Sequence, residues 1–234
     1  MSKARMNIVM LTGAGVSADS GVETFRASDG LWAKHNIEDV CTPEALERNP
    51  KLVLDFYNER RRQLKSVKPN AGHYAAAKLE EVFNVEVITQ NVDNLHERAG
   101  STKVLHLHGE LLKCRSMKDP SYICTTEDDV SIGDLCPNGG QLRPHIVFFG
   151  EQVPMLETAA KIVSKANIVI VAGTSLAVYP AAGLVGYAPE SAEIYVLDPA
   201  AVNVGGERVT YMRERFALAM PKLVDILFEK YRDK

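Results

Sequence analysis

The feature that most restricts how this chain can fold is an apolar run, residues 7–11, that ends in Thr12-Gly13-Ala14-Gly15. A short apolar run bounded by glycine is typical of a buried strand, and the glycines indicate a tight turn. A helical pattern begins directly after the turn. A strand, a glycine turn and a helix in this order are how a nucleotide-binding α/β domain begins.

Further apolar runs of the same kind follow along the chain. They lie at residues 85–88, 104–107, 168–171 and 194–197, and helical patterns between them lie at 70–83, with Asn70 as the N-cap, and at 157–166. Strands that alternate with helices favour a parallel sheet covered by helices on both faces. The predicted fold class is therefore α/β, a Rossmann-like parallel sheet domain with a smaller inserted lobe.

Two stretches interrupt this alternation. Residues 20–66 form a long insertion with a predicted helix at 50–65, and residues 109–145 have little periodicity and hold three of the four cysteines. We interpret the two stretches as a small lobe, at about 21–66 and 109–145, within a single domain spanning 1–234. The large lobe then comprises about 1–20, 67–108 and 146–234, and a ligand cleft lies between the lobes beyond the strand ends.

Composition narrows the class of protein. The 234 residues carry a net charge of −3, and the Lys and Arg residues are scattered apart from Arg60-Arg61-Arg62, so we expect no nucleic-acid partner. No apolar run reaches the ~18 residues of a membrane span, and the first residues contain no secretion signal. The four cysteines lack the density of a secreted framework. We therefore expect a cytoplasmic protein with free thiols and no membrane partner.

The glycine turn at residues 13–15 has more than one interpretation. Without a Cβ, Gly13 and Gly15 allow backbone amides to approach phosphates at the start of a helix. Ala18 completes a tolerated form of the dinucleotide fingerprint, which on this motif alone keeps a hydride-transferring oxidoreductase open. A tight turn without any ligand is equally consistent with the spacing.

Four sequence blocks extend the motif. They are Gly13-Ala14-Gly15-Val16-Ser17-Ala18-Asp19-Ser20-Gly21 with Thr24-Phe25-Arg26 and Gly30-Leu31-Trp32, then residues 89–96, then His108-Gly109-Glu110, and last Gly173-Thr174-Ser175. Together and in this order they resemble the signature of the sirtuin family. The resemblance implies an enzyme that cleaves NAD instead of passing hydride with it, and that removes acyl groups from protein lysine side chains. Its products are nicotinamide, free lysine and O-acyl-ADP-ribose.

Polar residues of the second block suit that chemistry. Breaking the nicotinamide–ribose bond gives the ribose oxocarbenium character, so the site needs amide donors and carboxylates with water excluded. Gln90, Asn91 and Asp93 supply such groups. The resemblance implies a catalytic Asn91 near the ribose and Asp93 on the nicotinamide amide. The alternative is that Asn91 and Asp93 only cap the loop that follows a strand.

His108 is the expected general base. An imidazole titrates near neutral pH, so it can take a proton from a ribose hydroxyl once the acyl oxygen has attacked the sugar. A single histidine beside a strand end is more often structural than catalytic. Accordingly, the neighbouring His96 and His106 are given no chemical role.

The resemblance also implies the set of residues around NAD. Arg26 lies on a loop over the cofactor, and Asp198 stands where the family commonly has an asparagine facing the adenosine ribose. The expected set is Gly13, Ala14, Gly15, Asp19, Thr24, Phe25, Arg26, Trp32, Gln90, Asn91, Asp93, His108, Gly173, Thr174, Ser175 and Asp198.

One further segment is expected at the substrate backbone. Val147, Phe148 and Phe149 begin a segment that resembles the family's strand that pairs with the substrate, with an aromatic ring over the acyl-lysine. Main-chain pairing of this kind gives affinity with little sequence selectivity. An ordinary apolar strand that joins the lobes is the alternative.

Tyr57 and Arg60 are expected at the acyl group. They stand three residues apart on the predicted helix, so their side chains share a face and can converge on one carboxylate. Tyr57-Asn58-Glu59-Arg60 also resembles the Tyr-x-x-Arg motif of sirtuins that remove succinyl and malonyl groups. The alternative places Tyr57 in ordinary packing and Arg60 on a solvated basic face with Arg61 and Arg62. Cys41 stands where that subclass usually has alanine.

The cysteines depart from the family pattern. Sirtuins typically bind a structural zinc through two Cys-x-x-Cys pairs, because four thiolates complete a tetrahedral shell. Neither pair is intact here, since the expected positions fall near Ser116, Leu135 and Asn138. The thiols in this region are Cys114, Cys124 and Cys136. The sequence therefore predicts NAD as the cofactor and no structural zinc.

Two other functions stay open. One is an NAD-dependent mono-ADP-ribosyltransferase, which would share the cofactor blocks. The other is a non-catalytic NAD-sensing module, which would tolerate loss of the base. The presence of His108 and of the substrate segment favours the deacylase, acting as deacetylase and desuccinylase.

Overall fold

The largest element of the fold is a six-stranded sheet with the strand order β3-β2-β1-β7-β8-β9. The computed structural model describes residues 5–22, 35–176, 179–200, 204 and 208–231. The strands are β1 (Asn7–Thr12), β2 (Asn84–Thr89), β3 (Val104–His106), β7 (Ile168–Ala172), β8 (Glu193–Leu197) and β9 (Val209–Met212). All neighbouring pairs are parallel, which confirms the predicted fold class.

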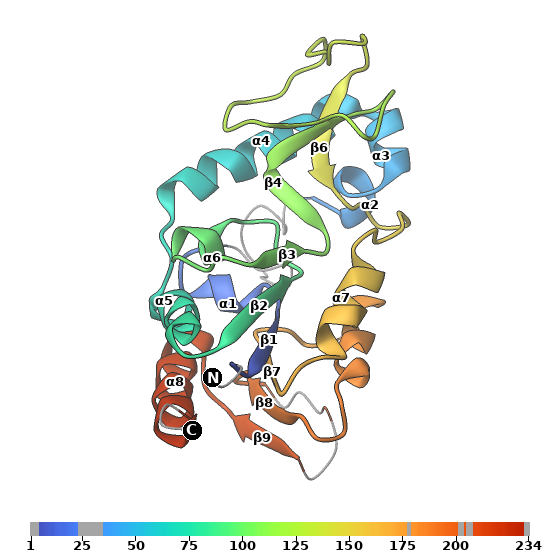
Figure 1. Cartoon of the computed structure of the whole chain (residues 1–234). Coiled ribbons are helices and arrows are strands. Elements are labelled where there is room, and N and C mark those ends of the chain that lie inside the picture. Colours follow the sequence, from blue (N-terminus) through green and yellow to red (C-terminus); the bar gives the residue numbers. More distant parts are fainter. Residues whose placement is uncertain (1–4, 23–34, 177–178, 201–203, 205–207, 232–234) are drawn as a thin grey trace.

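Helices cover both faces of this sheet (Figure 1). They are α5 (Ala71–Lys78) and α8 (Phe216–Tyr231) on one face, and α7 (Leu156–Val163) and the 3₁₀ helix η3 (Ala181–Tyr187) on the other. Along β1, Ile8 and Met10 join the core beneath α5 and α8, whereas Val9 and Leu11 join the core beneath α7 and η3. Successive strand residues point to opposite faces, so burial of both faces explains the continuous apolar runs.

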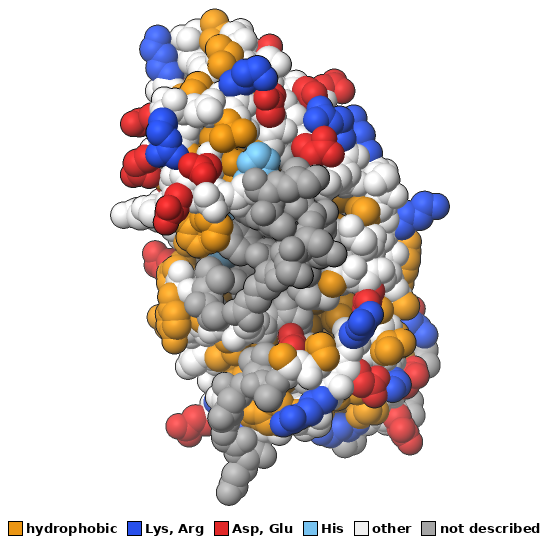
Figure 2. All heavy atoms as spheres, turned by 180° about the vertical axis from the view of Figure 1, so that it is seen from behind, with side chains coloured by type: hydrophobic (Ala, Val, Ile, Leu, Met, Phe, Trp, Pro, Cys, Tyr) orange, Lys and Arg blue, Asp and Glu red, His pale blue; other side chains and the backbone are white. Residues whose placement is uncertain are grey.

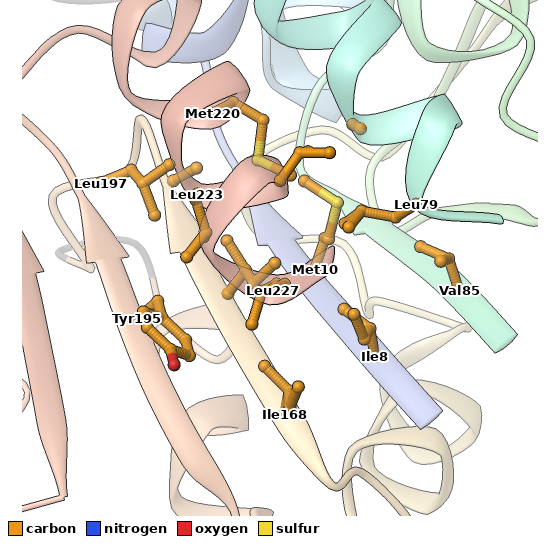
Figure 3. Packing of buried hydrophobic residues seen from close by; sticks show 14 of the residues in the cluster. Ile8, Met10, Leu79, Val85, Ile168, Tyr195, Leu197, Met220, Leu223 and Leu227 are labelled. Atoms are coloured by element: carbon orange, nitrogen blue, oxygen red, sulfur yellow. The ribbon is translucent and has the colours of Figure 1, made fainter. Parts of the chain in front are cut away.

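The core beneath α8 is shown in Figure 3, where Leu223 and Leu227 reach down between the side chains of the central strands. Leu223, Leu227 and Ile168 are fully buried. Removing side chains of this size from water stabilises the fold by about 1.5–3 kcal/mol each. This packing holds the strand ends, and with them the loops that follow, in a fixed arrangement.

The predicted helix at 70–83 is confirmed as α5 followed by the 3₁₀ helix η2 (Leu79–Glu81). Asn70 is its N-cap, because its side-chain oxygen accepts a hydrogen bond from the Gly72 amide at 3.0 Å. The Asn70 amide nitrogen also donates to the carbonyl of Val16 at 2.8 Å. One side chain thus caps α5 and ties it to the short helix α1 (Gly15–Ala18) behind the glycine turn.

A second, three-stranded antiparallel sheet forms the smaller lobe with three helices. Its order is β5-β4-β6, with β4 (Gly109–Ser116), β5 (Ile123–Thr125) and β6 (Leu142–Ile146). The helices are α2 (Ile37–Val40), α3 (Pro43–Arg48) and α4 (Pro50–Ser66), and α4 confirms the helix predicted at 50–65. The strands escape sequence analysis because β5 is short and largely exposed and a bulge interrupts the pairing of β4 with β6.

Arg61 joins α4 to this sheet. Its side chain is fully buried, and it donates to the carbonyl of Leu111 at 2.9 Å, to Asn58 Oδ1 at 2.6 Å and to Cys114 Sγ at 3.5 Å. The alternative that placed Arg61 on a solvated basic face is therefore wrong. The helical pattern could not show this, because the acceptors lie on β4, far along the chain.

Replacing Arg61 with methionine is expected to lower the free energy of unfolding by about 2–4 kcal/mol, because the buried Leu111 carbonyl loses its side-chain donor and the Asn58 amide oxygen keeps only the Val130 amide. Arg62→Met is the matched control, since Arg62 is half exposed and pairs with Glu59 and Asp129 at the surface. Urea unfolding of both variants measures the difference. Equal small losses in the two variants would contradict the role assigned to Arg61.

The surface opposite the view of Figure 1 carries charges of both signs in mixture (Figure 2). No large area of a single sign is visible on this face. Among the described residues, no helix combines the length and the apolar composition needed to cross a membrane.

Candidate active site

A pocket of about 450 Å³ lies between the two lobes, beside the carboxyl ends of β1, β2 and β7. The strand order turns around between β1 and β7, which is where ligands bind in open parallel sheets. The expected site residues that line this pocket are Gly13, Ala14, Gly15, Tyr57, Arg60, Gln90, Asn91, Asp93, His108, Val147, Phe148, Phe149, Gly173, Thr174, Ser175 and Asp198. The fold thus brings together the central blocks that lie far apart in the sequence.

Five expected cofactor residues are not placed in the pocket. Thr24, Phe25, Arg26 and Trp32 lie outside the described residues. Asp19 is described but does not line the pocket, and its carboxylate instead accepts from Arg215 Nη1 at 3.1 Å. Asp19 therefore links α1 to the start of α8, and its contact with a cofactor stays a prediction.

The amides of the glycine turn are already used within the protein. Gly13 N donates to the carbonyl of Ala172 at 3.1 Å, and Gly15 N donates to the carbonyl of Gly173 at 2.8 Å. The next two amides donate to carbonyls of the turn itself. The amides of Gly13 and Gly15 are therefore not available to phosphates, because an amide that has a protein acceptor has no second hydrogen to offer; for the amide of Ala14, which also lines the pocket, phosphate contact stays a prediction.

The glycines instead permit two turns to pack against each other. A Cβ on Gly13 would lie 2.8 Å from the Cβ of Thr174, and a Cβ on Gly15 would lie 2.7 Å from the Cα of Gly173. Gly173 itself has a φ of +57°, a conformation that glycine adopts without strain. The two glycine blocks thus pack closely against each other and together line one side of the pocket.

Asn91 and Asp93 meet at Ser17. The Asn91 side-chain nitrogen donates to Ser17 Oγ at 3.1 Å and to the carbonyl of Gly13 at 3.1 Å, and Ser17 Oγ donates to Asp93 Oδ2 at 3.0 Å. Asp93 Oδ1 also accepts from the Leu95 amide at 3.1 Å, so loop capping is present alongside the pocket position. Burial raises the pKa of the Asp93 carboxyl above its usual value. Ser17 was missed as a candidate, although it lies in the first motif block.

His108 has a defined tautomer. Its Nδ1 lies 3.1 Å from the carbonyl oxygen of Gln90, an acceptor, so Nδ1 carries the hydrogen and Nε2 carries the free electron pair. Burial lowers the pKa of His108 below its usual value, which keeps the ring neutral at neutral pH. The arrangement supplies a proton acceptor on the wall of the pocket.

Tyr57, Arg60 and Cys41 form the end of the pocket that belongs to the small lobe. The Tyr57 hydroxyl donates to Cys41 Sγ at 3.2 Å, and its ring stacks on Phe148 with 5.8 Å between centroids. Burial raises the pKa of Tyr57 well above its usual value, so the hydroxyl keeps its hydrogen. Tyr57 and Arg60 converge on one pocket, as their spacing on α4 predicts.

The segment at 147–151 forms no strand within the protein, because β6 ends at Ile146 and a turn follows; its pairing with a substrate backbone stays a prediction. Three of its amides are used within the protein: Val147 N donates to His108 O at 2.9 Å, Phe148 N to Glu151 Oε2 at 2.7 Å and Phe149 N to Cys41 O at 3.0 Å. These donors are not available to a substrate. Phe148 is buried, whereas Phe149 is largely exposed.

Glu151 holds this turn in place and was missed by sequence analysis. Its carboxylate forms ion pairs with Arg115 at 3.0 Å and with Arg143 at 2.7 Å, and Arg143 lies over the Phe148 ring at 4.0 Å. These arginines come from β4 and β6, and no local spacing in the sequence joins them to Glu151.

The positions expected for zinc ligands carry hydrogen bonds between protein groups. Cys136 Sγ lies 3.1 Å from Ser116 Oγ, and the Gly140 amide donates to the same sulfur at 3.3 Å. Cys114 lies opposite Cys124 in the pairing of β4 with β5. Within the described ranges no group of three or more potential ligands is found.

Elemental analysis of the purified protein is expected to give well below one zinc per chain, because four thiolates cannot converge here. A strong chelator should likewise leave the melting temperature unchanged, since a structural zinc contributes directly to folding. About one zinc per chain, retained through gel filtration, would contradict the prediction.

The fold and this pocket define a two-lobed α/β protein with a ligand site at the edge of its parallel sheet. The Sir2 family model matches residues 13–180, and the chain belongs to that family. An NAD-dependent protein deacylase of Aggregatibacter actinomycetemcomitans is 63% identical over 82% of this chain and 92% of the relative. One from Bacteroides thetaiotaomicron is 53% identical over 90% of this chain and 93% of the relative.

Solved structures agree with the fold. A Sir2 homologue in complex with NAD superposes with a TM-score of 0.87 at 37% identity, covering 97% of this chain and 91% of the other. A mutant Sir2 homologue in complex with ADP-ribose gives a TM-score of 0.88 at 36% identity, covering 98% and 95%.

Proposed function

We propose that this protein is an NAD-dependent protein deacylase, which removes acyl groups from lysine side chains of proteins and forms nicotinamide and O-acyl-ADP-ribose. One observation carries the proposal. His108, with Nε2 unprotonated, lines the same pocket as the hydrogen-bonded set Asn91, Ser17 and Asp93. A proton acceptor and a set of groups suited to a developing positive charge are what this reaction requires.

The pocket fits NAD by the chemistry of its donors and acceptors. When bound, NAD supplies the ribose carbon to which the acyl oxygen bonds as nicotinamide leaves. We assign the nicotinamide amide to Asp93 and the adjoining ribose to Asn91, whose amide nitrogen is held by Gly13 O and Ser17 Oγ. Because that nitrogen is held, the amide oxygen is the group that can face the ribose. Asp198, half-buried after β8, is assigned to the ribose at the adenosine end.

His108 acts after the bond to nicotinamide has broken. Its neutral Nε2 takes the proton from a ribose hydroxyl, which frees that oxygen to attack the acyl carbon. Because burial lowers the pKa of His108, this form persists at pH values below those at which an exposed histidine would be protonated.

The small-lobe end of the pocket supports a preference for dicarboxylic acyl groups. Arg60 supplies a guanidinium, and Tyr57 supplies a hydroxyl that must turn from Cys41 Sγ, its acceptor at 3.2 Å, to reach an acyl carboxylate; both residues line the pocket beside Phe148. Charge-assisted hydrogen bonds in such a place favour a carboxylate by about 1.5–3 kcal/mol. We therefore propose desuccinylation together with deacetylation.

The test is a peptide assay with NAD⁺ and mass spectrometry. Peptides carrying acetyl-lysine, succinyl-lysine or long-chain acyl-lysine are incubated in parallel with the purified protein. Loss of the acyl group together with release of nicotinamide supports the deacylase. A gain of ADP-ribose on the peptide would indicate a mono-ADP-ribosyltransferase, and no change would indicate a non-catalytic NAD-binding module.

The substrates we propose are proteins with acylated lysines, without a role for membranes or nucleic acid. We also propose a cytoplasmic location, since Cys41, Cys114, Cys124 and Cys136 are all free thiols, as is usual in a reducing compartment.

A further inference from the structure

Two histidines on one face of the chain contact consecutive carbonyls of the loop after β2. His108 Nδ1 lies 3.1 Å from the carbonyl oxygen of Gln90, and His106 Nδ1 lies 2.8 Å from the carbonyl oxygen of Asn91. His106 is the last residue of β3 (Val104–His106), and His108 follows it two residues later in a bend. His108 is the general base of the proposed function, whereas His106 has no role in it.

The imidazole rings of His106 and His108 differ in what surrounds their Nε2 atoms. His106 Nε2 lies 2.7 Å from Glu97 Oε1, whereas His108, whose Nδ1 contacts Gln90 O, lines the pocket. Both contacts of His106 are with acceptors, a carbonyl oxygen and a carboxylate. Since each needs a hydrogen from the ring, His106 carries two N–H groups and is an imidazolium. The His106 side chain is only 6% exposed, whereas that of Glu97 is 38% exposed, so the imidazole is buried beneath a carboxylate that reaches the surface.

The surroundings of His106 agree with a charged ring. Glu97 on α6 (Leu95–Arg98) and Glu110 on β4 both favour its charged form, and the pKa of His106 is raised despite burial. Burial raises the pKa of Asp93, and the charge on His106 offsets a part of that rise. His96, also nearby, is kept neutral because burial lowers its pKa well below the usual value.

We propose that His106, held as an imidazolium by Glu97, is a positioning residue that fixes the Asn91 carbonyl and thereby the Asn91 side chain at the reacting ribose. The inference rests on the proposed function for the role of Asn91. Asn91 is otherwise held at its amide, which donates to Thr89 Oγ1 at 3.0 Å, and at its side-chain nitrogen. The bond from His106 secures the backbone carbonyl, so the side-chain oxygen that we assign to the ribose belongs to a residue held at its other three polar groups.

The proposal predicts the direction in which activity changes as the pH rises. Below its raised pKa, His106 keeps both hydrogens and both contacts. As the pH rises through that pKa, one hydrogen is lost; the other stays on Nε2, because the carboxylate of Glu97 is a stronger acceptor than a carbonyl, so the Asn91 carbonyl then faces a lone pair. Positioning is therefore complete on the acid side and lost on the alkaline side. His108 must be neutral, so activity falls on the acid side of its lowered pKa, and the optimum lies between the two.

Glu97→Gln tests the charge without removing the contact. A glutamine amide donates to a neutral Nε2, so Nδ1 keeps its hydrogen on the Asn91 carbonyl at every pH. We expect this variant to retain activity at alkaline pH, where the parent loses it. Glu80→Gln is the matched control, because Glu80 accepts from Thr102 at 2.8 Å outside the pocket, and it should keep the parent profile.

The test measures two quantities over the same pH range: kcat for deacylation and the protonation state of the His106 ring nitrogens. In ¹⁵N-histidine-labelled parent protein, His106 should show two protonated ring nitrogens at neutral pH, and the midpoint of its titration should coincide with the alkaline fall in kcat for an acetyl-lysine peptide. His106→Ala should lower kcat by up to about a hundredfold with little change in the KM for the peptide. A neutral His106 at neutral pH, or a kcat that stays constant while His106 titrates, would overturn the inference. A parent without activity on any acyl peptide would instead refute the proposed function, and the nitrogen spectrum would still decide the state of His106.

Discussion

Replacing His108 with alanine is expected to lower kcat for deacylation by about 10²–10⁴-fold, the usual contribution of a positioned general base. The physical reason is the neutral Nε2 on the pocket wall, which no neighbouring group replaces in the arrangement described above. The acid limb of the kcat profile should disappear in the variant, because that limb reports protonation of His108. Steady-state assays over pH with an acetyl-lysine peptide measure both effects.

His145→Ala is a suitable control for the His108 variant. His145 lies on β6 outside the pocket lining, and burial lowers its pKa as it lowers that of His108. The control should therefore keep the acid limb and a kcat close to that of the parent. An unchanged deacylation rate in a folded His108→Ala protein would refute the proposed mechanism.

Replacing Arg60 with methionine is expected to lower kcat/KM for desuccinylation by about 10–100-fold, which corresponds to the ~1.5–3 kcal/mol of a charge-assisted hydrogen bond. Deacetylation should be spared, because an acetyl group has no carboxylate to pair with the guanidinium. Methionine retains the length of the side chain and the apolar wall of the pocket. Parallel assays of acetyl-lysine and succinyl-lysine peptides of one sequence give the ratio directly.

Arg62→Met serves as the control for Arg60→Met, since Arg62 lies two residues further along α4 and is half exposed. Its ratio of desuccinylation to deacetylation should match that of the parent. Equal losses of both activities on Arg60→Met, or no desuccinylation by the parent, would contradict the assignment of Tyr57 and Arg60 to a carboxylate.

Much of the fold could be predicted because the signals are local. The central strands β1, β2, β7 and β8 are buried on both faces, so their apolar runs are continuous in the sequence. The edge strand β9 (Val209–Met212) is partly exposed and carries no such run. Helix α8 was not predicted, and it contains Pro221, a residue that normally interrupts a helical pattern.

Tyr57 and Arg60 show which features of the site can be predicted from the spacing of residues along one helix. A spacing of three residues on a helix places two side chains on the same face, whatever that face packs against. The side chains of Tyr57 and Arg60 accordingly both line the pocket. The same spacing argument said nothing of Arg61, which lies between them in sequence and is fully buried against β4.

The sequence by itself determined which residue types are available and which elements carry them, because strand and helix periodicity depend on near neighbours. Only the tertiary structure decided what each group contacts. The amides at Gly13 and Gly15 were expected to be free and are used by Ala172 and Gly173. His106, given no role from sequence, bridges Asn91 and Glu97. Hydrogen bonds act over about 3 Å, and which groups come that close is set by the packing of segments distant in sequence.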